Sequence, residues 1–183
     1  MKEIRIHGRG GQGSVLAARM LASAFVAEGK CVASFPTYGF ERRGAPVMAF
    51  TRVDDKPIRE KTQVYHPDCM VAIDPTLLRV RTLFSGITSE GVLILNSPAE
   101  LQARPDHNVK LAGIINARQI ALEEMGRDVP NTCLVGALAA TTDWVTLESI
   151  IASLPECFGG DKLNKNIRCT ERGYREVKIQ RWQ

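Results

Sequence analysis

The pattern of apolar and polar residues predicts strands that alternate with helices. Short apolar or alternating runs, which favour strands, occur at residues 4–7, 31–35, 47–53, 69–73, 91–96 and 109–115. Segments with helical spacing or helix-capping residues occur at 14–28, 76–84, 116–125, 131–141, 146–154 and 162–183. This alternation predicts one α/β domain over residues 1–183: a Rossmann-like, doubly wound, mostly parallel sheet flanked by helices. We expect the last helix, 162–183, to cover the core or to pack on a partner subunit.

Composition adds limits to this picture. The chain has 183 residues, of which 44% are hydrophobic and 24% charged, and a net charge of +4. A charge this small gives no reason to expect nucleic acid as a partner. No apolar run reaches the roughly 20 residues of a membrane span, so we expect no membrane partner. Five scattered cysteines without a CxxC pair predict no metal site and a reduced, cytoplasmic protein.

A glycine-rich loop follows the first predicted strand. It reads Gly8-Arg9-Gly10-Gly11-Gln12-Gly13 and leads through Ser14 into the first predicted helix. With the strand at 31–35, this segment predicts a βαβ unit. Glycines permit positive φ and close backbone approach, and the N–H groups at the helix start favour an anion. The loop is therefore a candidate phosphate cradle, and a purely structural tight turn is the alternative.

Two common kinds of phosphate loop do not fit these residues. A dinucleotide-binding unit places an acid about 20 residues after the loop, where this chain has Ser34 and Phe35 and no acid before Glu41. A Walker A loop ends in Gly-Lys-Ser/Thr, whereas this loop ends in Gly13-Ser14-Val15. The sequence therefore argues against an NAD-dependent dehydrogenase and against ATP hydrolysis.

A second informative stretch follows the strand at 31–35. Residues 38–44 read Tyr38-Gly39-Phe40-Glu41-Arg42-Arg43-Gly44 and are expected beside the glycine loop, near the carboxyl ends of the strands. The arginines are suited to a phosphate or carboxylate. Tyr and Arg are also common at protein interfaces, so docking of a partner subunit is an equal alternative. A solvated surface loop is the third interpretation.

Together these motifs resemble the gamma subunit of the 2-oxoacid:ferredoxin oxidoreductases, the pyruvate synthase family. The similarity includes the glycine loop and the pattern Tyr38-Gly39-x-Glu41-x-Arg43-Gly44. It extends to Asp74, to the segment that begins Asn131-Thr132, and to a terminal Asn166-x-x-Cys169-Thr170-x-x-Gly173-Tyr174 pattern. Cys169 and Thr170 depart from the family's usual Ala-Phe. The resemblance runs from about residue 3 to residue 175.

The resemblance implies a non-catalytic subunit of an enzyme that decarboxylates a 2-oxoacid oxidatively and forms an acyl-coenzyme A. Thiamine diphosphate and 4Fe-4S clusters would sit on alpha, beta and delta partners, with ferredoxin or another electron acceptor. Residues Gly8 to Ser14 would help to bind coenzyme A, and Arg9, Arg42 or Arg43 would add charge for its 3′-phosphate. Tyr38, Gly39, Glu41, Arg42, Arg43, Gly44, Asn131 and Thr132 would contact the ligand or another subunit.

The sequence offers no catalytic residue. The histidines are isolated, and we expect His7, at the end of the first strand, to be packed rather than to act as a base. Asp74 is expected to cap a helix. The alternative to the subunit is a free-standing nucleotide- or coenzyme A-binding regulatory module without catalytic partners.

Overall fold

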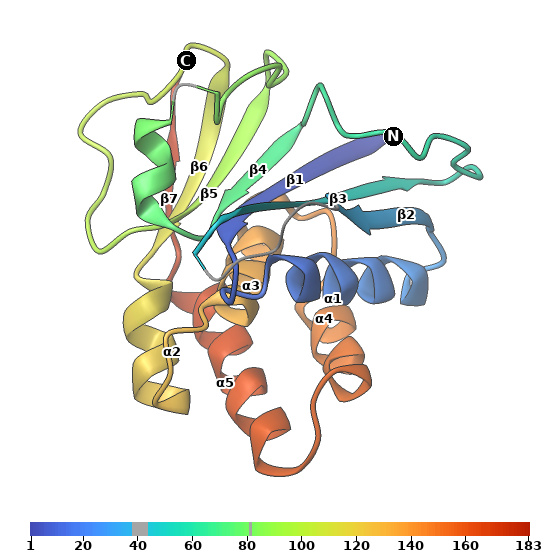
Figure 1. Ribbon diagram of the computed structural model, residues 1–183, viewed down its shortest axis with the longest axis vertical. Coiled ribbons are helices and arrows are strands. Elements are labelled where there is room, and N and C mark those ends of the chain that lie inside the picture. Colours follow the sequence, from blue (N-terminus) through green and yellow to red (C-terminus); the bar gives the residue numbers. More distant parts are fainter. Residues whose placement is uncertain (38–43, 81) are drawn as a thin grey trace.

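Within residues 1–37, 44–80 and 82–183, which the computed structural model describes, seven strands form one sheet in the order β2-β3-β1-β4-β5-β6-β7 (Figure 1). They are β1 (Lys2–Arg9), β2 (Cys31–Pro36), β3 (Pro46–Asp54), β4 (Cys69–Ala72), β5 (Gly91–Asn96), β6 (Val109–Ile115) and β7 (Lys178–Arg181). In the centre, β1, β4, β5 and β6 are parallel. The predicted α/β class with a mostly parallel sheet is confirmed.

Antiparallel β3 lies between β1 and β2, the two strands of the predicted βαβ unit. Ile6 of β1 faces Val71 of β4 in parallel register on one side and Ala49 of β3 in antiparallel register on the other. β2 pairs only with the outer side of β3, so it is not a neighbour of β1. Residues 37–45, between β2 and β3, are too few for a parallel crossover, which takes a dozen residues or more. The two strands therefore pair antiparallel, a consequence that the sequence analysis had not drawn.

The α-helices of the described residues share one face of the sheet (Figure 1). They are α1 (Ser14–Ala27), α2 (Ala117–Met125), α3 (Asn131–Thr142), α4 (Leu147–Ser153) and α5 (Gly160–Glu176). Each contributes buried side chains to the core cluster that contains Ile4 and Ile6 of β1. α3 is buried on all sides, because its small residues let β5, β6 and α5 approach it closely.

The opposite face of β4 to β6 is covered by a short 3₁₀ helix, η1 (Pro75–Arg79), and the turns after it. The prediction of a helix over 76–84 is therefore wrong beyond Arg79. Leu77, Leu83 and Ile87 fill this second core. The buried guanidinium of Arg5 also donates to the carbonyls of Leu83 and Ser85, both at 2.8 Å, and so binds oxygens that a helix would use.

The end of the chain forms a strand instead of continuing as a helix. α5 ends at Glu176, and Val177 is extended, with φ −63° and ψ 133°. β7 then pairs antiparallel with β6, with Ile179 opposite Gly113. The expected helix over 162–183 is thus wrong for residues 177–183. Of the apolar stripe expected on that helix, Leu163, Ile167 and Val177 pack against the chain's own core, while Tyr174 is exposed.

Two glycines allow α3 and α5 to cross at close range. A Cβ on Gly136 of α3 would lie 2.1 Å from the carbonyl oxygen of Thr170 on α5. A Cβ on Gly173 of α5 would lie 2.0 Å from the carbonyl oxygen of Cys133 on α3. Any side chain at either position would push the helices apart.

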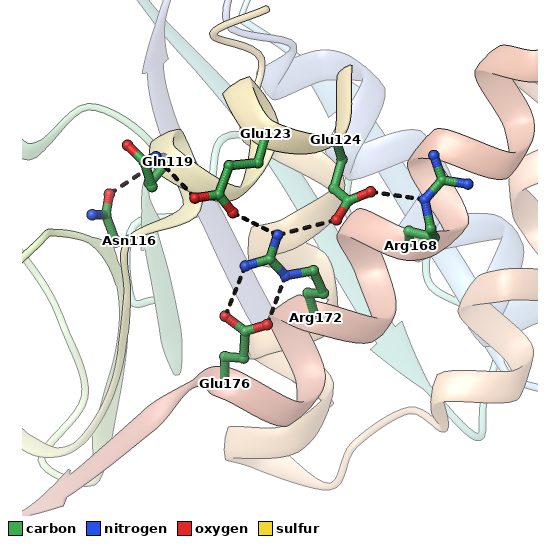
Figure 2. A network of polar contacts seen from close by, with 7 residues as sticks. All are labelled: Asn116, Gln119, Glu123, Glu124, Arg168, Arg172 and Glu176. Carbon is green, nitrogen blue, oxygen red and sulfur yellow. Dashed lines mark hydrogen bonds and ion pairs between the residues drawn. The ribbon is translucent and has the colours of Figure 1, made fainter. Parts of the chain in front are cut away.

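An ion-pair network joins α2 to α5 near this crossing (Figure 2). Arg172 of α5 donates to Glu123 and Glu124 of α2, at 2.7 and 3.1 Å, and to Glu176 of its own helix at 2.6 Å. Arg168 donates to Glu124 at 2.7 Å. The side chains of the network are 19–48% exposed, and its three carboxylates balance the charge of the two guanidinium groups.

Candidate functional site

The glycine loop lies between the carboxyl end of β1 and the first turn of α1. Its backbone has positive φ at Gly11 (96°) and at Gly13 (80°), in the left-handed region that glycine adopts without strain. A Cβ on Gly13 would lie 2.5 Å from Nδ2 of Asn131, whereas a Cβ on Gly11 would meet nothing within 4 Å. Gly13 is therefore required both for conformation and for space, and Gly11 for conformation alone.

Part of the loop's backbone is bonded within the chain. The N–H of Gly10 donates to the carbonyl of Ala45 at 2.9 Å, and the N–H of Gln12 to the carbonyl of Arg9 at 3.0 Å. Among the described residues, no backbone acceptor meets the N–H groups of Gly11, Gly13 or Ser14, and no side chain caps α1. Free N–H groups at a helix start, together with the helix dipole, favour an anion.

Ser14 adds a polar group to the same place. Its Oγ is the one buried side-chain oxygen or nitrogen without a hydrogen-bond partner in the described part of the chain, and the residue is 3% exposed. It lies against Gly8, where a Cβ would come within 2.2 Å of it. An unpaired buried hydroxyl costs stability, so this atom fits a ligand group that would pair with it.

Asp74, just after β4, bonds to two side chains of the glycine loop. Its carboxylate accepts from Arg9 Nε at 3.0 Å, from Gln12 Nε2 at 3.1 Å and from the N–H of Thr76 at 2.9 Å. Burial raises the pKa of Asp74, but the bonds from Thr76 and Gln12 and the charge of Arg9 outweigh this effect and leave that pKa below its usual value. The expected helix cap is confirmed, and the contacts to Arg9 and Gln12 were not foreseen.

The start of α3 contacts the glycine loop. Asn131 Nδ2 donates to the carbonyl of Gly13 at 3.3 Å, and Thr132 Oγ1 donates to Oδ1 of Asn166 at 3.1 Å. Asn131 is 1% exposed and Thr132 is fully buried. Asn131 therefore supports the loop, whereas Thr132 bonds to α5, and direct contact of either residue with a ligand or another subunit stays a prediction.

Of the second predicted stretch, the structure describes only Gly44. Its N–H donates to the carbonyl of Gly10 at 3.2 Å, and its carbonyl accepts from Arg9 Nη1 at 3.3 Å. This end of the stretch therefore lies beside the glycine loop, as expected. Tyr38, Gly39, Glu41, Arg42 and Arg43 lie outside the described residues, and their predicted contacts stay predictions.

Sequence reasoning missed two buried arginines on the other face of the sheet. Arg5 donates from Nε to Nε2 of His7 at 2.9 Å, and Arg52 donates to Glu3 at 2.5 Å. Burial, and then the charge of Arg5, lower the pKa of His7 to about 3, so His7 is a neutral, packed residue as predicted. The alternation of Ile4, Arg5 and Ile6 is the signal that places Arg5 opposite the helices.

The described residues hold no group of three or more histidine, cysteine or acidic side chains placed to bind a metal ion. None of the helices in that part of the chain is both long and apolar enough to cross a membrane.

These features define a Rossmann-like α/β protein with a glycine-rich loop at the start of its first helix. The family model described as pyruvate ferredoxin/flavodoxin oxidoreductase matches residues 3–176. The common gamma subunit of the pyruvate/ketoisovalerate oxidoreductases of Pyrococcus furiosus is 44% identical over 182 residues, 98% of each chain. The gamma subunit of the NADH-dependent phenylglyoxylate dehydrogenase of Aromatoleum evansii is 46% identical, over 98% of this chain and 95% of that one. The chain belongs to this family, as a gamma subunit.

Solved structures agree with this assignment. The crystal structure of pyruvate oxidoreductase subunit PORC from Thermotoga maritima has a TM-score of 0.86 and 37% identity, over 97% of each chain. The 2-oxoglutarate:ferredoxin oxidoreductase of Magnetococcus marinus, with 2-oxoglutarate, coenzyme A and succinyl-CoA bound, has a TM-score of 0.74 and 20% identity. This chain corresponds to 30% of that longer one, and the likeness shows the shared fold.

Proposed function

We propose that this gamma subunit holds the pyrophosphate of coenzyme A at its glycine loop, within an oxidoreductase that converts a 2-oxoacid to an acyl-coenzyme A. The observation that carries the proposal is the buried hydroxyl of Ser14 beside the N–H groups of Gly11 and Gly13, all of which lack a hydrogen-bond partner among the residues that the structure describes. Three donors that meet no protein acceptor in the described residues suit a diphosphate, which offers several anionic oxygens.

The position of β3 argues against a nicotinamide dinucleotide at the same loop. A dinucleotide fold carries its ribose-binding acid at the end of its second strand, which lies beside the first strand and parallel to it. Here β4 is the parallel neighbour on one side of β1, and the position of the second strand on the other side is taken by antiparallel β3, which reaches the loop with Pro46 and Val47, opposite Arg9 and Gly8. Neither residue can accept a hydrogen bond from ribose through its side chain.

Arg9 is a fixed cation at the edge of this loop. Asp74 and Thr76 hold its guanidinium, with Nη2 donating to Thr76 Oγ1 at 2.9 Å. Because Asp74 already balances its charge, Arg9 suits the orientation of a phosphate better than strong attraction to it. Arg42 and Arg43 remain the proposed sources of further positive charge.

The rest of the reaction belongs to the partners. We propose alpha, beta and delta chains that carry thiamine diphosphate and 4Fe-4S clusters, with ferredoxin or another acceptor, all in the cytoplasm. Thiamine diphosphate supplies the carbon chemistry when bound, and this chain's residues bind coenzyme A and hold the complex together. Relatives of nearly equal identity are named for pyruvate and ketoisovalerate or for phenylglyoxylate, which supports a substrate pocket on other subunits.

A matched pair of glycine substitutions tests the loop. Gly11 and Gly29 both have positive φ, 96° and 78°, and a Cβ at either would meet nothing within 4 Å. Gly11→Ala and Gly29→Ala therefore carry similar backbone strain, but only Gly11 belongs to the loop. We expect Gly11→Ala to raise the KM for coenzyme A of the assembled enzyme by about tenfold, the effect of one lost charged hydrogen bond. Equal KM values for the two variants would refute the proposal.

Purification of the tagged chain from its host separates this proposal from the free-standing module. Co-purification with chains that carry thiamine and iron–sulfur signatures is the expected result. A lone, colourless protein under gentle conditions would favour the regulatory module.

A further inference from the structure

One edge of the sheet is open to a further strand. β2 is the last strand at its end of the sheet and pairs on one side only, with β3 (Figure 1). At the opposite edge, the side chain of Gln180 in β7 exchanges two hydrogen bonds with the backbone of Leu101, both at 3.2 Å. In the part of the chain that the structure describes, no residue bonds to the outer side of β2 in this way.

The hydrogen-bond pattern of β2 identifies the backbone groups on this edge. The N–H of Thr37, directly after β2, donates to the carbonyl of Met48 in β3 at 2.9 Å. Antiparallel strands bond through alternate residues, so every second residue before Thr37 faces β3 with its backbone groups. The residues between them, Val32, Ser34 and Pro36, face outward. They present two N–H groups and three carbonyls, because proline has no N–H.

β2 lacks the features that commonly protect an edge strand. Its sequence, Cys31–Pro36, contains no charged residue, and its register with β3 runs without a bulge. Charged side chains and bulges are the usual devices that prevent pairing at a sheet edge. An uncharged, regular edge suits the addition of a strand from another chain.

A groove of about 740 Å³ runs along the same strand. Residues 32–37 line one side of it, and Phe50, Ile58, Lys61 and Gln63 line the rest. The ring centroids of Phe35 and Phe50 lie 5.5 Å apart, so two packed aromatic rings belong to the lining. Apolar side chains of an added strand would pack against this part of the groove.

The wall at residues 58–63 is fixed to the sheet. Arg52 of β3, which is 2% exposed, donates to the carbonyls of Thr62 and Gln63 at 2.6 and 3.0 Å. The carboxylate of Glu3 balances the charge of Arg52 at 2.5 Å. The groove is therefore preformed, and binding requires little further ordering of its wall.

The groove has a positive charge. Lys61 is exposed and is the one charged side chain among the described lining residues, since the others are apolar or neutral. Complementary charge therefore favours an occupant that combines apolar side chains with an acidic residue.

A second copy of this chain fits the edge poorly. In an antiparallel pair of two β2 strands centred on Ser34, Pro36 of one copy would face Val32 of the other. Proline has no N–H to donate, so the carbonyl of Val32 would stay unpaired in both copies. β2 also contains no acid to meet Lys61. A segment of different sequence avoids both losses.

We propose that β2 and this groove receive an extended segment of a partner subunit, which adds a strand to the sheet and places an acidic residue at Lys61. The inference rests on the proposed role of this chain within a larger oxidoreductase. Backbone hydrogen bonds to Val32, Ser34 and Pro36 provide affinity, and the apolar lining with Lys61 provides selectivity.

Amide hydrogen exchange in the purified complex and in the full-length chain alone tests the edge. Mass spectrometry with electron-transfer fragmentation resolves single residues. We expect the N–H groups of Val32 and Ser34 to exchange about tenfold more slowly in the complex. The N–H groups of Ala33 and Phe35 face β3, so they are the internal control and should change little.

Lys61→Glu tests the charge, and Lys56→Glu is its matched control. Both lysines are exposed and lie in the same segment, but only Lys61 lines the groove. We expect Lys61→Glu to raise the Kd of this chain for the remaining subunits of the enzyme by about tenfold, measured by biolayer interferometry. Lys56→Glu should leave this Kd unchanged.

Three results would overturn the proposal. One is equal exchange of the Val32 and Ser34 amides in the complex and in the chain alone. Another is an equal Kd for the two lysine variants. The third is a chain that is dimeric by light scattering with both amides already protected, because the edge would then belong to a second copy.

Gly11→Ala keeps this proposal apart from the proposed function. Protected amides in the complex, with an unchanged KM for coenzyme A in Gly11→Ala, would support the edge and overturn the loop. Unprotected amides in a complex whose KM rises with Gly11→Ala would support the loop and overturn the edge.

Discussion

Arg9 Nε lies 3.0 Å from Oδ2 of Asp74, so the ends of two adjacent parallel strands are joined by an ion pair at the edge of the glycine loop. The same carboxylate accepts from Gln12, whose Oε1 in turn accepts from the N–H of Arg9 at 2.8 Å. The loop's shape therefore depends on a residue more than 60 positions away.

Replacement of Asp74 tests this dependence through pH. The pKa of Asp74 is lowered in the folded chain, so its contribution to stability is present above the ordinary pKa of about 4. The contribution is lost as the pH falls through the lowered value. We expect Asp74→Asn to be less stable than wild type at pH 7, by urea unfolding, and the difference to shrink below about pH 4. Glu90→Gln, at an exposed position, should show no such trend.

Ser14→Ala should affect stability and ligand binding in opposite directions. Removal of an unpaired buried hydroxyl is expected to stabilise the free chain by about 1 kcal/mol. The same change removes a donor from the proposed pyrophosphate site and should weaken coenzyme A binding. Ser23→Ala, in the same helix, is the comparison for a paired hydroxyl, because Ser23 Oγ donates to Glu156 at 2.7 Å and its loss is expected to bring no stabilisation. Unfolding and calorimetry on one set of samples measure both effects, and a loss of stability in Ser14→Ala would contradict the assignment.

The close crossing of α3 and α5 predicts an unusual cost for alanine. In an exposed helix, glycine to alanine stabilises by about 1 kcal/mol. At Gly136 and Gly173 the new Cβ would meet backbone carbonyls, so we expect Gly136→Ala and Gly173→Ala each to destabilise by about 3 kcal/mol. Urea unfolding measures the change, with Asn164→Ala, at an exposed position of α5, as a nearly neutral comparison. A stabilised Gly136→Ala would show that the helices can separate without penalty.

The network around Arg172 predicts a salt-dependent loss of stability (Figure 2). Arg172→Gln would leave the carboxylates of Glu123, Glu124 and Glu176 without their shared partner. We expect a lower Tm at pH 7 and low salt, and a smaller difference in 1 M NaCl, because exposed charges are screened.

Acid should abolish the effect of Arg172→Gln as well. Hydrogen bonds from Gln119 and Arg172 lower the pKa of Glu123, and those from Arg168 and Arg172 lower the pKa of Glu124. Their contribution is therefore present above the ordinary glutamate pKa of about 4.3 and disappears as the pH falls through the lowered values. Arg175→Gln serves as the control, and an equal loss of Tm in both variants would contradict the role of the network.

Most of the fold could be predicted from the sequence, because the strongest sequence signals are local. The apolar run at 69–73 and the glycine loop need only short-range patterns, and both were placed correctly. The insertion of β3 between β1 and β2 is a matter of pairing, which no local pattern states. Likewise, the local sequence of residues 178–181 suggests part of a basic helix. These residues form a strand because they pair with the edge of β6.

In the candidate site, too, local patterns could be predicted from the sequence and tertiary contacts could not. Gly8 to Ser14 were recognised from their own spacing. Asp74 was predicted as a helix cap and Asn131 as a ligand or subunit contact, and both belonged to the family resemblance. Their role as supports of the loop was not predicted, since their contacts to Arg9, Gln12 and Gly13 form through the tertiary fold.

The glycine loop is held by contacts to Ala45, Asp74 and Asn131, which come from three other segments of the chain. Its geometry therefore cannot be transferred with its own residues alone. A graft of residues 2–27 into another Rossmann-like protein would carry the glycines but not the partners that set their geometry. Conversely, if the proposed function holds, substitutions at residue 74 or 131, which are distant from the loop in sequence, are expected to weaken coenzyme A binding. The geometry of the loop is thus a property of the whole domain, and it depends on residues in separate segments.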